Sequence, residues 1–147
     1  MKKNKKLIVK WAVPLIALLL LPIVLIAALA GRDYSNAVMD DFKAAHWDVK
    51  VLDLEKSEEL AILRKLVSDE RIADLPECDV IVASKAGIPL VCVLAFPNKR
   101  AAKQYSKEYM KTLDEDRQNE YKAEKRIRGN CLLFYAGYGA LDIYAGE

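Results

Sequence analysis

The chain has little of what enzyme active sites and metal centres are built from. Its 147 residues include one histidine and three cysteines, without a CxxC or HExxH motif. A zinc site needs three or four ligands of these types at suitable spacing, so we expect neither a metal site nor a bound cofactor. The sequence also lacks any motif that fixes a reaction. We therefore expect a protein that is not an enzyme.

A surplus of positive charge is also missing from most of the chain. The sequence holds 23 basic and 21 acidic residues, a formal charge of +2, and five of the lysines stand in the first 30 residues, which contain no acid. Residues 31–147 are left with 18 basic and 21 acidic residues, a charge of −3. A nucleic-acid-binding domain normally carries a basic surplus on its folded part, so we expect no nucleic-acid partner.

Residues 11–30 form a run of twenty residues without a charge. As a helix, a run of this length covers the roughly 30 Å hydrocarbon core of a bilayer. The lysines lie in residues 1–10, ahead of the run, so the positive-inside rule places the N-terminus in the cytoplasm. We expect a cytoplasmic segment 1–10, a single-pass signal anchor 11–30 and one extracytoplasmic domain 31–147.

A cleaved signal peptide is the alternative for the same run. Ala28-Leu29-Ala30 precedes Gly31 with the small-x-small pattern of a cleavage site. A secretory hydrophobic region is usually about 7–15 residues, shorter than this one, which favours the uncleaved anchor. Cleavage after Ala30 would release a secreted factor with the same folded part.

The pattern of apolar residues beyond the run predicts an α+β domain. Helical spacing, alternation and buried apolar runs follow one another in the order α-β-α-β-β-α-β, with a hairpin formed by residues 79–84 and 88–96. Without its first helix this is β-α-β-β-α-β, the order of a ferredoxin-like sheet. We expect a small antiparallel sheet with the long helices on one face.

Three of the expected strands are apolar at every position, as in residues 80–83, 90–94 and 132–135. This is typical of strands that are covered on both faces of a sheet. The helix expected over residues 35–46 has a narrow apolar stripe, so part of the second face would stay open. We therefore expect a homodimer or a membrane-protein partner to cover it.

A row of lysines at a spacing of four follows the expected helix start at Asn98. Like charges at this spacing repel one another by a few tenths of a kcal/mol per pair, and an anionic lipid or wall polymer would offset that cost. Glu108 and Asp114 stand close enough in sequence to relieve it instead, which would make the row an ordinary solvated face. The row consists of Lys99, Lys103, Lys107 and Lys111.

The three cysteines lie at or inside the apolar strand runs, where a free cysteine acts as a small buried side chain. An oxidising compartment would also permit a disulfide. A hairpin centred on Lys85 places Cys78 directly opposite Cys92, whereas a turn centred one residue later makes them a diagonal pair. A Cys78–Cys92 disulfide is therefore a candidate.

These features predict a membrane-anchored extracytoplasmic module that acts through protein or envelope contacts. The alternative is a small hydrolase or thiol enzyme presented at the membrane, which would use Cys131 or Cys92 with His46. His46 otherwise reads as a surface side chain at the end of the first helix.

Overall fold

The computed structural model describes residues 33–137 and 139–145. The predicted anchor 11–30, the segment 1–10 and the alternative cleavage after Ala30 all lie outside these residues. Among the helices of the described residues, none has the length and apolar character needed to cross a membrane.

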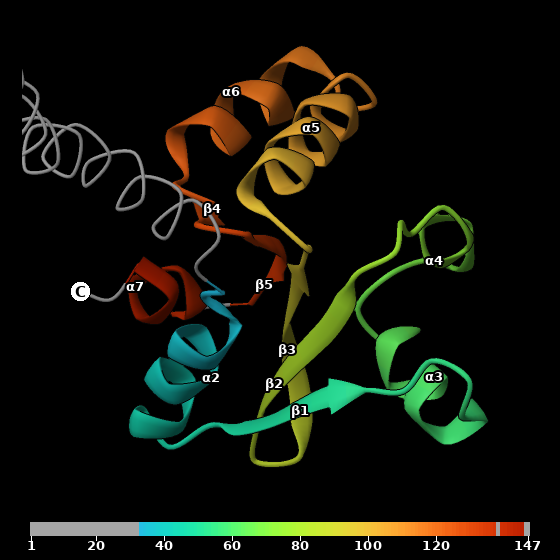
Figure 1. Cartoon of the computed structure of the whole chain (residues 1–147), viewed down its shortest axis with the longest axis vertical. Helices are drawn as coiled ribbons and strands as arrows, with labels where there is room; N and C mark the ends of the chain where they lie inside the picture. Colours follow the sequence, from blue (N-terminus) through green and yellow to red (C-terminus); the bar gives the residue numbers. More distant parts are fainter. Residues whose placement is uncertain (1–32, 138, 146–147) are drawn as a thin grey trace, which may run out of the picture. The chain divides into compact units, whose positions relative to one another are not determined.

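The described residues form an α+β domain around a five-stranded antiparallel sheet, as expected (Figure 1). The strand order is β1-β2-β3-β5-β4, and every neighbouring pair is antiparallel. The strands are β1 (Asp48–Leu52), β2 (Asp79–Lys85), β3 (Ile88–Ala95), β4 (Ile127–Arg128) and β5 (Cys131–Ala136). The helices are α2 (Ser35–Ala44), α3 (Ser57–Leu63), α4 (Asp69–Ala73), α5 (Lys99–Met110), α6 (Glu115–Ala123) and α7 (Ala140–Ala145).

The predicted hairpin is confirmed as β2 and β3. Lys85 pairs with Ile88, so the loop consists of Ala86 and Gly87 alone. Both loop residues have positive φ, 52° and 77°, which matches the twist of a two-residue hairpin. The pairing of Val82 with Cys92 then fixes the register along the rest of the hairpin.

The central strands bury both of their faces, because alternate side chains enter two separate cores. One core lies under α2 and includes Phe42, Ile81, Val93 and Leu133. The core on the other face is formed by the neighbouring strand residues together with side chains of α3, α5 and α6: Val80, Val82, Cys92, Leu94, Leu132, Leu63, Ala102 and Tyr121.

Side chains of α3 and α5 share one core, as expected for the long helices, but the expectation that part of the other face stays open is wrong. Figure 1 shows α2 and α7 side by side, and side chains of both helices belong to the same core. In α7, Tyr144 is 1% exposed and Ala140 is fully buried. The argument for a partner from an uncovered sheet face therefore loses its premise.

The ferredoxin-like order is also wrong. In that arrangement the strands before and after the first long helix run parallel, with another strand between them. Here β1 and β2 are antiparallel neighbours. In place of the one long helix of that arrangement, the connection between them contains α3 and α4, which are seven and five residues long.

Candidate functional site

The lysine row lies on the outer side of α5. Asn98 begins this helix as predicted, since its side chain accepts a hydrogen bond of 2.9 Å from the backbone N–H of Ala101. Ala102 and Ser106 point into the domain and are buried. The four lysines are exposed, and the row ends with Lys111 at the C-cap: Lys99, Lys103, Lys107 and Lys111.

Aromatic packing fixes α5 against the sheet. The ring centroid of Tyr105 lies 5.5 Å from that of Phe96, and the ring centroid of Tyr109 lies 5.1 Å from that of Phe134. The guanidinium of Arg71 in α4 stacks over Tyr109 at 4.8 Å. The lysines therefore project from a helix whose position is set by a packed core.

The acids that would neutralise the row are engaged elsewhere. The carboxylate of Glu108 accepts a hydrogen bond of 3.2 Å from Gln104. Asp114 caps α6 by accepting from the backbone N–H of Arg117 at 2.9 Å, and it also lies 3.5 Å from the Arg117 guanidinium. Within the described residues, no lysine of the row has an ion-pair partner. Neither acid therefore forms an ion pair with the row among the described residues.

Charge is distributed unevenly along the described chain. Residues 99–128 hold ten basic and six acidic residues, a net charge of +4. Residues 33–98 hold seven basic and thirteen acidic residues, a net charge of −6. The lysine row thus belongs to a basic segment of a described chain that is otherwise acidic.

The candidate disulfide does not form in this register. Cys78 and Cys92 are free thiols, and the residue opposite Cys92 is Val82 rather than Cys78. The turn lies about two residues later than the disulfide requires, because Ala86 and Gly87 form the loop by themselves. Cys78 precedes β2 and is half-buried against the same core as Cys92.

The thiols have the environment of inert side chains. Burial raises the pKa of Cys92 and of Cys131 to about 12 and the pKa of Cys78 to about 11. A thiol with such a pKa is protonated at neutral pH and is a poor nucleophile. The ring of His46 has no hydrogen bond to a cysteine or carboxylate in the part of the chain that the structure describes.

His46 follows the C-cap residue of α2 and has a positive φ of 62°. Its backbone N–H donates to the carbonyl of Lys43, and the N–H of Trp47 donates to the carbonyl of Phe42, both at 3.0 Å. The Phe42 and Trp47 rings meet edge to face at 5.6 Å. This is a Schellman motif with its apolar contact, which accounts for the placement of His46.

Sequence reasoning missed the role of Asn130. Its side-chain N–H group donates to the carbonyl of Phe96 at 2.8 Å and to Asp33 at 3.1 Å, and its side-chain oxygen accepts from the backbone of Tyr34 at 2.8 Å. A Cβ on Gly129, where φ is +60°, would meet the Tyr34 ring. The Gly129-Asn130 turn therefore fastens the first described residues to the sheet, and the pair of turn residues was the only signal of it in the sequence.

A hollow of about 310 Å³ lies beside Asn130. Its lining includes Asp33, Glu77, Cys78 and Asp79. Hydrogen bonds from the Ser35 backbone and from Asn130 hold the pKa of Asp33 below its usual value, so its carboxyl group is ionised. Groups of three or more His, Cys, Asp or Glu side chains suited to holding a metal ion are absent from residues 33–137 and 139–145. The thiol that lines the hollow, Cys78, has a raised pKa and is not a reactive nucleophile. Among the described residues, the hollow also has no set of side chains suited to binding a metal ion.

In comparisons with known proteins, no family model, curated protein or solved structure matches the chain.

Proposed function

We propose that the chain is a membrane-tethered, non-enzymatic module that binds a polyanionic surface outside the cytoplasm through the lysine row. Residues 11–30 supply the tether, and the lysines that precede them set the orientation. The chemistry recognised is a dense array of phosphate or carboxylate groups, whether on lipid headgroups or on a wall polymer.

The observation that carries the proposal is the row of four exposed lysines along α5, none of which forms an ion pair in the described residues. The four are Lys99, Lys103, Lys107 and Lys111. A lysine near an anionic bilayer contributes about 1 kcal/mol to binding, so a row of four is sufficient for a salt-dependent association. The poor nucleophilicity of the buried thiols supports a binding role over a catalytic one.

Replacing Lys103 and Lys107 by glutamine tests the row. At about 1 kcal/mol per lysine, the double variant should bind a polyanion at least tenfold more weakly at low salt. The full chain is held in discs of zwitterionic lipid, and its binding is measured to anionic phospholipid vesicles and, separately, to a soluble polyphosphate. Weaker binding of the variant to both the vesicles and the polyphosphate would show that the row recognises anionic groups in general. Weaker binding to the vesicles alone would show that it recognises lipid.

The matched control is Lys43→Gln with Lys65→Gln, which removes two other exposed lysines that have no ion-pair partner in the described residues. This variant has the same net charge and should bind within twofold of the natural chain. Equal loss in the two variants would show that only total charge matters, and the absence of binding by the natural chain would refute the proposal.

A further inference from the structure

The strand β1 lies at an edge of the sheet and pairs with β2 along one side only. Within the described residues no strand pairs with its other side. Val51 is 45% exposed on this strand and Val49 is partly buried. An edge of this kind presents free backbone donors and acceptors to a further strand.

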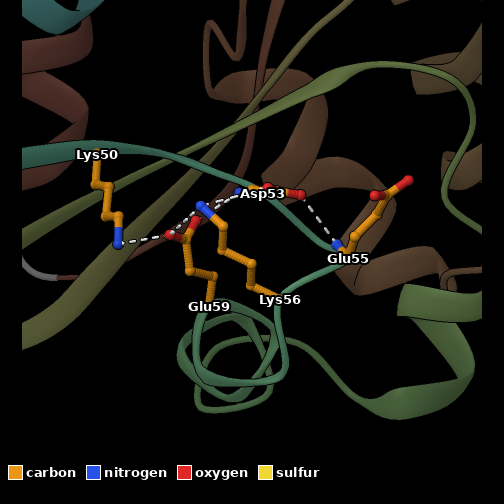
Figure 2. A network of polar contacts seen from close by, with 5 residues as sticks. All are labelled: Lys50, Asp53, Glu55, Lys56 and Glu59. Carbon is orange, nitrogen blue, oxygen red and sulfur yellow. Dashed lines mark hydrogen bonds and ion pairs between the residues drawn. The ribbon is translucent and has the colours of Figure 1, made fainter.

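A polar network limits how far another strand could pair along this edge (Figure 2). The carboxylate of Glu59 in α3 accepts the backbone N–H of Asp53 at 2.5 Å and lies 2.9 Å from the Lys50 ammonium. These two contacts hold the pKa of Glu59 below its usual value, so the carboxylate stays charged. The Asp53 N–H is therefore taken, and the free edge ends at Leu52. At its other end the N–H of Trp47 donates to the Phe42 carbonyl and the positive φ of His46 turns the chain into α2, so the free edge begins at Asp48.

We propose that a second copy of this chain pairs antiparallel with β1 through a two-fold axis at Val49, which joins the two sheets into one. In an antiparallel pair, directly opposed residues point to the same face of the sheet. An axis between two residues would oppose each residue to one that points to the other face, so the two-fold axis must pass through a residue. Within β1, an axis at Val49, Lys50 or Val51 leaves at least three opposed pairs inside the strand, whereas an axis at either end residue leaves one.

Charge selects among these three centres. An axis at Lys50 sets that lysine against the partner's Lys50, and like charges directly opposite one another are unfavourable. An axis at Val51 sets Lys50 against the partner's Leu52 and leaves Asp48 without an opposed residue on the free edge.

An axis at Val49 sets Asp48 opposite the partner's Lys50, twice by symmetry. Asp48 is exposed and has no ion-pair partner in the described residues. The Lys50 side chain is 54% exposed, and its ammonium has donors left after pairing with Glu59. The same register sets Val49 against the partner's Val49 on the opposite face of the sheet. The edge is thus complementary to itself on both faces.

Charged residues on an edge strand can instead serve to prevent pairing. If the charges on β1 only prevent pairing, no register between two copies is preferred. If they align a second copy, one register forms. Three pairs of residues on the free edge form a small interface, so the dimer is weak, and a covalent trap measures it better than sedimentation does.

The test is disulfide trapping of the full chain in a non-ionic detergent, with single cysteines placed along β1. Directly opposed residues of antiparallel strands have Cα atoms about 4.5 or 5.5 Å apart, within disulfide range. Val49→Cys should therefore give a covalent dimer at least ten times faster than Val51→Cys. With the axis at Val49, position 51 of one copy lies about four residues along the strand from position 51 of the other copy. The natural chain, with its three free cysteines, provides the background rate.

A second pair of variants tests the charge argument in the Val49→Cys background. Asp48→Lys faces the partner's Lys50 and should slow trapping at least fivefold. Asp40→Lys makes the same charge change at an exposed position on α2 and should leave the rate within twofold. Fastest trapping at Lys50→Cys or Val51→Cys, equal rates along the strand, or no covalent dimer above background would each overturn the proposal.

Discussion

Replacing Asn130 by alanine is expected to lower the free energy of unfolding by about 3 kcal/mol. The side chain is 5% exposed and hydrogen-bonds the Phe96 carbonyl, Asp33 and the Tyr34 backbone. Alanine leaves the Phe96 carbonyl and the Tyr34 N–H without these bonds at sites that are buried or partly buried. Each such group costs about 1–3 kcal/mol when its partner is removed.

The measurement is urea unfolding of the full chain in detergent, followed by circular dichroism. Asn119→Ala is the matched control, since Asn119 is exposed on α6 and has no side-chain hydrogen bond in the described residues. This control should change stability by less than about 0.5 kcal/mol. If Asn130→Ala costs no more than the control, the Gly129-Asn130 turn does not fasten the start of the domain.

Replacing Tyr144 by alanine is expected to have the largest effect, a loss of about 3–5 kcal/mol in the free energy of unfolding. Tyr144 fills the core between α2 and the sheet, and its hydroxyl donates to the Cys131 carbonyl at 2.9 Å. Burial raises the pKa of this hydroxyl, so it remains a donor across the physiological range. Alanine opens a cavity and removes the hydrogen bond together.

Tyr144→Phe separates these two contributions. It keeps the ring and loses only the hydroxyl, so it should cost about 1 kcal/mol. Both variants are compared with the natural chain by the same unfolding measurement. An alanine variant as stable as the phenylalanine variant would mean that α7 does not close this face of the sheet.

The elements that sequence analysis predicted well are those with strong local signals. The hairpin has two apolar runs with Gly87 between them, and α5 has Asn98 as its cap. The helix α7 was missed because it has six residues, too few for helix propensity alone to hold it. Its stability comes from Tyr144 and Ala140 in the core, which are contacts between distant parts of the chain.

The order of the strands could not be read from the sequence for a related reason. The expected order placed one helix between the first two strands, whereas the chain forms α3 and α4 with a break between them. For the candidate site, the spacing of the lysines was visible but the pairing of Asp114 with Arg117 was not. Side chains four residues apart on a helix can be predicted to align, but the rotamers that choose their partners depend on the folded surroundings.

The central claim, a tethered domain outside the cytoplasm with its lysine row on a polyanion, is tested most directly by acetylating intact cells with a membrane-impermeant amine reagent. Modification is then measured at each lysine by mass spectrometry. We expect Lys43 and Lys65 to be acetylated, Lys103 and Lys107 to be protected at least fivefold relative to them, and that protection to disappear at high salt. The lysines of residues 1–10 should stay unmodified until the membrane is opened. Equal acetylation of Lys103, Lys107, Lys43 and Lys65 would contradict the binding role of the row, and an unmodified domain in intact cells would contradict its location.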